Sequence, residues 1–273
     1  MNVLALLRHP QFSPGSIEND RAIMEAVACR LQAEGHEVLM MQEQDWQGEK
    51  ADLVMTMGRE ADVLNELEHS GMRVINAPAA IRTCGNRTML GEVMRREAIP
   101  TAPAHGPHGY WLKRADACAQ QEGDVVYARD EAQLEDCKRA FRQRGIDRYE
   151  VSAHVAGDVV KFYGVRGTGF FRCFYPTDDG RTKFGTEAVN GAAHHYRFSL
   201  ESMHNCAERL AEAIGLDVYG GDCIVRADGT FCMIDFNDWP SFSRCREEAA
   251  DAIAGKIKEM NTLKITIEGS GEV

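Results

Sequence analysis

Apolar residues along positions 1–77 repeat with a spacing that alternates between that of strands and that of helices. Short apolar runs predict strands, and the segments between them repeat apolar residues at helical spacing, as Ile23, Val27 and Leu31 do. Gly35 follows, a residue that is common just past the end of a helix. This βαβ alternation predicts a small parallel sheet with helices packed on it. The expected strands span 2–7, 37–41, 52–57 and 72–76, and the expected helices span 17–34 and 59–70.

The prolines at 78, 100, 103 and 107 punctuate the next stretch and predict a domain boundary there. Beyond them the pattern predicts two hairpins, 159–175 and 218–237, among further strands and helices. We therefore expect three units, formed by residues 1–85, 86–155 and 156–273. The other expected strands span 110–113, 125–128 and 148–154, the other helices span 88–97, 130–144, 201–214 and 243–260, and 269–273 is expected to be a tail.

Composition indicates a folded protein with reduced thiols. The chain has 273 residues, 44% of them hydrophobic, which is enough for a substantial core. Its nine cysteines are scattered without a CxxC spacing, which argues against a disulfide framework and a zinc cluster. The first residues do not match a signal peptide and no apolar run could span a bilayer, so we expect a cytoplasmic protein with no membrane partner. The net charge of -11 disfavours nucleic acid as a partner.

The most informative segment is the second hairpin. Asp228-Gly229 is a strong signal for a two-residue turn, because both positions of such a turn need a positive φ. A turn there places Asp222 directly opposite Asp235, with Cβ atoms about 4.5–5.5 Å apart. Asn237 is two residues past Asp235 and therefore points to the same face.

Two carboxylates that face each other on buried strands repel, so a proton, a basic side chain or a cation must offset the cost. Two carboxylates and an amide oxygen form a hard-oxygen set that suits Mg²⁺. No histidine or thiolate shares that face, which disfavours zinc. The alternative is a surface hairpin with polar ends. Against it stands the apolar character of the strand centres, which predicts strands covered on both faces.

The hairpin resembles the C-terminal signature of the ATP-grasp superfamily. That signature is an acidic residue on one strand, an Asp-Gly turn, then an acidic residue, any residue and Asn, followed by a proline-containing turn. Here it corresponds to Asp222 and to the run Asp235-Phe236-Asn237-Asp238-Trp239-Pro240. The order of elements matches over nearly the whole chain, and the likeness is closest to glutathione synthetases, D-alanine–D-alanine ligases and ribosomal-protein glutamate ligases. The resemblance implies an α/β ATP-grasp fold with α+β grasp lobes, an N-terminal βαβ pre-ATP-grasp domain, and ATP and Mg²⁺ as cofactors.

Carried over one residue at a time, the same resemblance assigns three groups of site residues. Lys113 matches the strand lysine that reaches the nucleotide phosphates, and Lys161 matches a base that grips the γ-phosphate or the transferred group. The residue that holds the ribose is open between Glu150, Ser152 and Ala153. The predicted sets are Asp222, Asp235 and Asn237 for the metal, Arg87, Lys113, Glu150, Lys161 and Met233 for the cofactor, and Lys161, Arg172 and Asn190 for catalysis.

Some features depart from this pattern or compete with it. The glycine-rich phosphate loop of the family is not evident in 115–123, after Lys113. The run 164–169 imitates a phosphate loop, but β-like residues follow it, which favours a hairpin turn. His194 and His195 would point to opposite faces of a strand, so exposure, or one of them facing the substrate from a loop, is expected rather than a shared metal ion. Ser241 either caps the last helix or contacts the substrate.

The leading hypothesis is an ADP-forming carboxylate–amine ligase that phosphorylates a carboxylate of a small molecule or peptide and then joins it to an amine. The first alternative is a phosphotransferase like the inositol-phosphate kinases, which would need a denser basic pocket. The second is a protein that binds nucleotide without catalysis. Related ligases are often dimers, so a homodimer stays open. The basic pocket of the first alternative would be supplied by Arg166, Arg172, Arg181, Lys183, Arg197 and Arg244.

Overall fold

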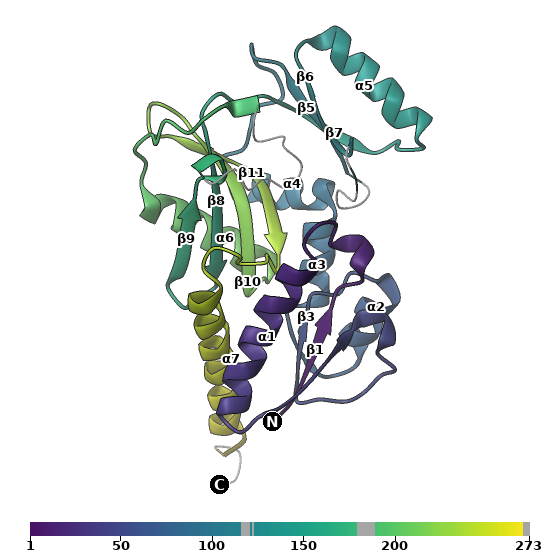
Figure 1. The fold of residues 1–273 in the computed structure, drawn as a ribbon, viewed down its shortest axis with the longest axis vertical. Helices are drawn as coiled ribbons and strands as arrows, with labels where there is room; N and C mark the ends of the chain where they lie inside the picture. Colours follow the sequence, from purple (N-terminus) through teal and green to yellow (C-terminus); the bar gives the residue numbers. More distant parts are fainter. Residues whose placement is uncertain (116–120, 122, 179–188, 270–273) are drawn as a thin grey trace.

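Three separate sheets organise the chain in a computed structural model, which describes residues 1–115, 121, 123–178 and 189–269, the side chains of 262–269 excepted (Figure 1). One sheet is parallel and two are antiparallel. Each sheet falls within one of the three expected units, and the limits of those units as domains stay a prediction. The first unit is α/β with a parallel sheet and the other two contain antiparallel sheets, as the sequence predicts.

The first sheet has the order β2-β1-β3-β4 and all its neighbours pair in parallel. β1 is central, and its side chains from Val3 to Leu7 are buried because helices cover both faces. The carboxyl ends of β1 and β3 therefore meet at one edge of the sheet. The elements are β1 (Asn2–Leu7), α1 (Ile17–Ala33), β2 (Glu37–Gln42), β3 (Leu53–Thr56), α2 (Ala61–His69) and β4 (Arg73–Ile75), with short 3-10 turns at Pro10–Phe12 and Glu43–Asp45.

Two helices connect this sheet to the second one, which is antiparallel with the order β6-β5-β7 and is covered by α5. Asn86 caps the second of the connecting helices, since its side chain accepts a hydrogen bond from the backbone N–H of Met89. This cap places Arg87 at the first position of the helix. The elements are α3 (Pro78–Gly85), α4 (Arg87–Arg96), β5 (Tyr110–Arg114), β6 (Val125–Ala128), α5 (Glu131–Gln143) and β7 (Tyr149–Ala153).

The third sheet is also antiparallel and has the order β11-β10-β8-β9. Gly215 ends the helix that precedes β10 and has a φ of 87°, the left-handed conformation expected just past a helix end. The predicted hairpin at 164–169 is confirmed, because β8 and β9 pair in antiparallel fashion on either side of it. The elements are β8 (Asp158–Val165), β9 (Phe170–Phe174), a 3-10 turn at Pro176–Asp178, α6 (Leu200–Ile214), β10 (Val218–Val225), β11 (Phe231–Asp238) and α7 (Arg246–Gly269).

One hydrophobic core joins the first sheet to the third. The terminal helix α7 runs beside α1, as Figure 1 shows at the lower end of the molecule. Ile253 and Ile257 of α7 pack in the same buried cluster as Val27 and Leu31 of α1, and Trp239 joins them from the end of β11. The first and third expected units are therefore held together by burial and not by a linker alone.

Most expected elements are present within a few residues of their predicted ends. The helix α3 is an exception, because the proline-rich stretch was taken as a boundary, whereas Pro78 occupies the first helical turn, where proline is tolerated. No helix among the described residues combines the length and the apolar character of a membrane span. The phosphate-loop stretch 116–120 and the residues 270–273 lie outside the described residues.

The β10–β11 hairpin has a different loop from the one predicted, but the same register at its acidic residues. The loop is one residue longer, because Arg226 N–H donates to Thr230 O at 2.8 Å and only Gly229 of its residues has a positive φ. A β-bulge then inserts Ile234 between the paired strands, which shifts the register back by one residue. Asp222 is therefore paired with Asp235, as predicted.

Candidate functional site

A cavity of about 330 Å³ lies where the three sheets meet, and each sheet contributes residues to its walls. The parallel sheet supplies Arg8 and Arg59 from the loops at its carboxyl edge. Lys113 and Trp111 come from β5, two residues apart on a strand and therefore on one face. The floor is the face of the third sheet that carries Asp222 and Asp235.

The floor contains a row of charged residues that crosses three strands. Lys161 of β8 is directly opposite Asp222 of β10, which is directly opposite Asp235 of β11. Lys161 is the one residue of β8 that is not buried, and its Nζ lies 2.8 Å from Asp222 Oδ1. Burial alone would lower the pKa of Lys161, but the carboxylate of Asp222 outweighs burial and raises it well above the ordinary value. Lys161 is therefore a permanent cation of the site.

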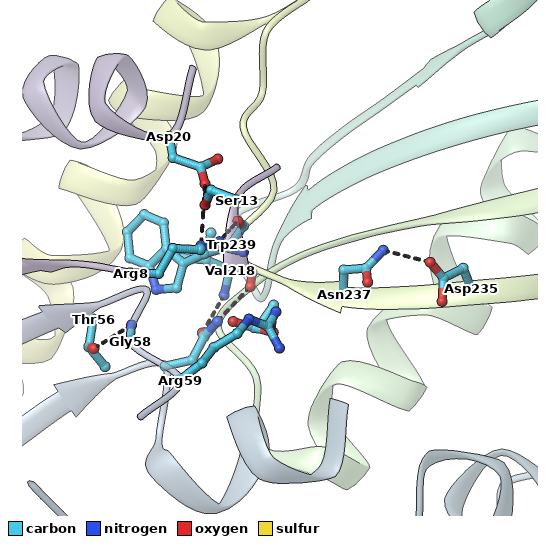
Figure 2. Close-up of polar contacts among 12 residues, drawn as sticks. Arg8, Ser13, Asp20, Thr56, Gly58, Arg59, Val218, Asp235, Asn237 and Trp239 are labelled. Atoms are coloured by element: carbon cyan, nitrogen blue, oxygen red, sulfur yellow. Dashed lines mark hydrogen bonds and ion pairs between the residues drawn. The ribbon is translucent and has the colours of Figure 1, made fainter. Parts of the chain in front are cut away.

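Asp235 has two polar neighbours of its own. Arg87, at the first position of α4, lies with Nη1 3.2 Å from Asp235 Oδ1, and Asn237 donates from Nδ2 to Asp235 Oδ2 at 3.1 Å (Figure 2). Burial would raise the pKa of Asp235, but Arg87 and Lys113 outweigh it and lower the pKa to about 2. Each acid of the row thus has a basic partner, Lys161 for Asp222 and Arg87 for Asp235.

Lys113 connects the small antiparallel sheet to the hairpin. Its Nζ donates to the backbone carbonyl oxygen of Ile234 at 2.8 Å, which is the residue that the bulge inserts. Burial, with the nearby Arg87 adding to it, lowers the pKa of Lys113 to about 8. This amine is therefore close to losing its proton in the structure as it stands, and an added negative charge in the cavity would stabilise its charged form.

The side-chain oxygen atoms on the floor of the cavity are of the type that binds magnesium ions. Asp222 and Asp235 offer carboxylate oxygens and Asn237 offers an amide, which is the hard-oxygen set that Mg²⁺ prefers. Among the described residues, no group of three or more histidine, cysteine, aspartate or glutamate side chains could hold a metal ion, which disfavours a zinc site. These placements agree with the predicted metal residues, whose role stays a prediction.

One side of the cavity is apolar and could hold a flat ring. Trp111, Val155, Val159 and Ile224 line it, and the indole Nε1 of Trp111 donates to His154 Nδ1 at 3.1 Å. This bond fixes the orientation of the indole ring. The sequence analysis assigned Trp111 no role, although its place two residues before Lys113 was a signal that it shares the face of Lys113.

Several of the predicted contact residues also line the cavity. Asn190 does so, and its Nδ2 donates to the carbonyl oxygens of Val155 and Gly157 at 2.9 and 3.0 Å. Of the three candidates for the ribose contact, Ser152 and Ala153 line the cavity and Glu150 does not. Glu150 is instead paired in register with Lys113 on the neighbouring strand. Ser241 lines the cavity, five residues before α7 begins.

Besides Glu150, two of the predicted site residues are not brought to the cavity. Met233 is buried in the core against α6, on the face of β11 that points away from the row. Arg172 shares the face of Lys161 but lies on the edge strand β9, where the carboxylate of Glu248 on α7 binds it. Neither residue lines the cavity, and the sequence-based assignments of Met233 to the nucleotide and of Arg172 to catalysis stay predictions that this placement does not support.

His194 and His195 also lie outside the cavity. The backbone N–H and ring of His194 contact the buried carboxylate of Asp158, and His195 lies beside Asp178 and Tyr175. Neither histidine lines the cavity.

Arg8 and Arg59 also line the cavity but are not among the residues predicted from the sequence. Arg8 directly follows β1 and Arg59 follows β3 by three residues. Since ligands of parallel sheets bind at the carboxyl ends of the strands, these positions were a usable signal. Figure 2 shows both arginines gathered near the end of β11, with Asn237 and Asp235 farther along the strand.

Comparison with curated proteins finds distant relatives and no matching family model. Beta-citrylglutamate synthase B from Homo sapiens is 26% identical over 194 residues, which are 64% of this chain and 49% of that protein. The protein of the same name from Danio rerio is 24% identical over 216 residues, 72% of this chain and 52% of that protein. The chain thus spans about half the length of the curated relatives it matches.

Solved structures share the fold over almost the whole chain. The D-alanine–D-alanine ligase from Coxiella burnetii has a TM-score of 0.66 at 11% identity, covering 98% of this chain and 99% of the ligase. A RimK domain ATP-grasp protein from Sphaerobacter thermophilus has a TM-score of 0.63 at 20% identity, covering 93% and 98%. A D-alanine–D-alanine ligase from Bacillus anthracis, complexed with ATP, has a TM-score of 0.65 at 11% identity, covering 96% and 99%.

The fold is therefore that of the ATP-grasp proteins. Within that class, the structures it matches include D-alanine–D-alanine ligases and a RimK domain protein, and its curated relatives include beta-citrylglutamate synthases. This confirms the predicted fold class and the predicted resemblance.

Proposed function

We propose that this protein is an Mg²⁺- and ATP-dependent carboxylate–amine ligase that forms ADP and acts through an acyl phosphate. The observation that carries the proposal is the row Lys161–Asp222–Asp235 on the floor of the cavity, with Asn237 on the same strand as Asp235. The relatives named above are called synthases and ligases, and one matching structure was complexed with ATP.

The chain's own residues fit the charge that such chemistry must hold. Lys113, Lys161 and Arg87 line the cavity within reach of the two acids and can bind phosphate oxygens as cations. Bound to Asp222, Asp235 and Asn237, Mg²⁺ would neutralise phosphate charge. The apolar wall with Trp111 suits the adenine ring.

In the proposed reaction, a carboxylate oxygen of the substrate forms a bond to the γ-phosphorus of ATP while the bond to the β-phosphate oxygen breaks and ADP leaves. An amine nitrogen then forms a bond to the carbonyl carbon, phosphate leaves, and the nitrogen loses its proton. The protein contributes by holding the groups in line and by stabilising negative charge at the transferring group. Lys161, as a permanent cation, is placed for the second task.

The test is a search for nucleotide binding and for the acyl phosphate. Calorimetry with Mg²⁺ and a non-hydrolysable ATP analogue should show binding that is lost when EDTA removes the metal. Turnover with ATP, citrate, glutamate or D-alanine as acids, and amino acids as amines, should release ADP and phosphate. Hydroxylamine should trap the acyl phosphate as a hydroxamate. Absence of nucleotide binding would overturn the proposal.

The same experiment separates the two alternatives. A phosphotransferase would give a stable phosphorylated product without hydroxamate, and a binding protein would hold nucleotide without ADP release. The structure favours neither. Of the six bases that the kinase reading would need, Arg181 and Lys183 lie outside the described residues. The other four, Arg166, Arg172, Arg197 and Arg244, do not line the cavity.

A further inference from the structure

The cavity continues past the metal row to the carboxyl edge of the parallel sheet. There it is lined by two arginines, Arg8 and Arg59, with Asp20 and Asp238 beside them. The net charge of the protein is -11, so an anionic ligand that enters the cavity depends on locally gathered bases. The proposed phosphate-binding residues account for Lys113, Lys161 and Arg87, but not for these two arginines.

Each of the two arginine side chains forms an ion pair with an aspartate. Arg8 Nε lies 3.3 Å from Asp20 Oδ2, and Arg8 Nη2 donates to the carbonyl oxygen of Trp239 at 2.6 Å (Figure 2). Arg59 Nη2 lies 2.5 Å from Asp238 Oδ1. The side chains of Arg8 and Arg59 are each 10% exposed, whereas that of Asp238 is 0% exposed and that of Asp20 is 9% exposed. All four side chains line the cavity, so each arginine faces it beside its own carboxylate partner.

Arg8 also keeps a donor for a ligand. Its Nη1 has no hydrogen-bond partner among the described residues, although the side chain lines the cavity. The Nη2 hydrogen bond and the ion pair with Asp20 hold the guanidinium, although Nε itself makes no hydrogen bond. A guanidinium held in this way loses little further rotamer freedom when it binds an anion through Nη1. This is the geometry of a preorganised binding group and goes beyond what a structural ion pair requires.

The loops that carry the two arginines are tied to one buried carboxylate. Glu43 is 0% exposed, and it accepts hydrogen bonds from the backbone N–H groups of His9 and Arg59, each at 2.6 Å, and of Glu60 at 2.8 Å. His9 adjoins Arg8. A single side chain therefore fixes the backbone at both arginines relative to each other, and Glu43 is a positioning residue for the pair.

The spacing to the metal row sets the size of what binds. Asp238, the partner of Arg59, is three residues past Asp235 on β11, which is about 10 Å along a strand. A carboxylate that reacts beside the row therefore lies several ångströms from the arginines. A second carboxylate of the same small molecule can reach them.

From this arrangement, and resting on the proposed ligase function, we propose that Arg8 and Arg59 bind a second, unreacting carboxylate of the acid substrate. The substrate class is then a small dicarboxylate or tricarboxylate and not a monocarboxylate. Planar guanidinium groups suit carboxylate oxygens better than a lysine would, which explains why arginine stands at both positions.

The test measures binding to the protein loaded with Mg²⁺ and a non-hydrolysable ATP analogue. The probes are succinate, glutarate and citrate, with glutaramate as a match for glutarate that lacks one carboxylate. The unmodified protein should bind at least one dicarboxylate or tricarboxylate, and should bind glutarate about tenfold or more tightly than glutaramate if glutarate has the right length, since hydrogen bonds to charged groups have that strength. If none of the three acids binds the loaded protein, the proposal is overturned.

Variants separate recognition from simple structural support. With the tightest probe, Arg8→Gln and Arg59→Gln should each weaken binding about tenfold or more, and Arg8→Lys should restore part of it. Arg82→Gln is the matched control, because Arg82 of α3 forms an exposed ion pair with Glu68 of α2 and does not line the cavity. It should change probe binding less than twofold.

The same variants distinguish failure of this inference from failure of the proposed function. Nucleotide binding is measured first in each protein and should stay within about threefold in the arginine variants. Loss of it in the unmodified protein would contradict the ligase proposal itself. Normal nucleotide binding with unchanged probe affinity in Arg8→Gln and Arg59→Gln would show that the two arginines only support the fold. If Arg8→Gln does not fold, Arg8→Lys and Arg59→Gln decide the question.

Discussion

Lys113 on β5 donates a hydrogen bond from Nζ to the carbonyl oxygen of Ile234, the residue that the bulge inserts into β11. The bulge leaves that carbonyl without a ladder partner, so the lysine satisfies it. The contact also ties the small antiparallel sheet to the sheet that carries Asp222 and Asp235. An amine placed in this way is both a structural contact and a titrating group.

The first prediction concerns the proton of Lys113. Its pKa of about 8 means that much of the amine is neutral at pH 8.5 in the free protein. Nucleotide phosphates would raise that pKa, so Mg·ATP binding at pH 8.5 should take up at most about three-quarters of a proton. Calorimetry in two buffers of different ionisation enthalpy measures this uptake.

Lys113→Arg provides the control, because its guanidinium stays charged throughout this range. It should show little uptake at pH 8.5, and both proteins should show little at pH 6.5. Stability follows from the same shift. The unfolded chain binds more protons than the native one between pH 8 and about 10.5, so the cost of charged Lys113 is relieved as pH rises through that window. Equal binding enthalpies in both buffers would contradict the assignment.

The second prediction concerns Asp235. Asp235→Asn should reduce Mg²⁺-dependent nucleotide binding and turnover by more than about 100-fold, since even outer-shell partners of a metal ion contribute 10- to 100-fold. The protein should stay folded. The pKa of Asp235 is about 2, so its stabilising contribution is present above the unfolded pKa and is lost as pH falls through about 4 to 2.

Asp228→Asn makes the same chemical change in the same hairpin and serves as the control. Asp228 lies in the exposed loop, where it accepts hydrogen bonds from Thr230. Nucleotide binding should therefore be unchanged in that variant. Near-normal turnover of Asp235→Asn, measured as ADP release, would remove the basis for the metal assignment.

The pairing of Asp222 with Asp235 was predicted correctly from the sequence, although the turn from which it was predicted differs from the observed one. A two-residue turn at Asp228-Gly229 gives the correct pairing of Asp222 with Asp235. The real loop is one residue longer, and the bulge at Ile234 compensates for it. Hairpin signals in sequence show where a chain turns, whereas a bulge depends on contacts from another sheet, here the amine of Lys113.

Side-chain direction was predictable along a strand but not across the molecule. Strand alternation predicted that Asn237 shares the face of Asp235, and the family resemblance predicted Lys161, which lies opposite Asp222. Neither could show that α7 covers the edge strand and presents Glu248 to Arg172. Arg8 and Arg59 follow strands of the parallel sheet, which was a usable signal, but their place beside β11 depends on how the first sheet packs against the third.

The third prediction concerns the close packing behind the row. A Cβ atom on Gly221 would lie 2.3 Å from the carbonyl oxygen of Asp235 and 2.5 Å from Cζ of Phe162. Gly221→Ala should therefore destabilise the protein by about 1–3 kcal/mol and weaken nucleotide binding, because β10 and β11 must move apart. Thermal unfolding and calorimetry measure the two effects. Gly255→Ala, on α7 with nothing within 4 Å, should be neutral or slightly stabilising.

The fourth prediction concerns Glu43, whose carboxylate holds the backbone of both arginine loops. Glu43→Gln keeps the size of the side chain but replaces one acceptor oxygen by an NH₂ group, so at least one of three buried N–H groups loses its partner. We expect a loss of about 1–3 kcal/mol in the free energy of unfolding. A Cβ atom at position 58 would lie 2.6 Å from Glu43 Oε2, so the glycine leaves room for this carboxylate.

Ligand binding separates this positioning role from general stability. Below its unfolding temperature, Glu43→Gln should bind Mg²⁺ and nucleotide normally, because the metal row lies on another sheet. Its affinity for dicarboxylate probes should fall about threefold or more, since Arg8 and Arg59 are no longer held in register. Glu37→Gln, at an exposed position at the start of β2, is the control and should change neither property. A destabilised Glu43→Gln with unchanged probe affinity would show that the arginine pair keeps its geometry without this carboxylate.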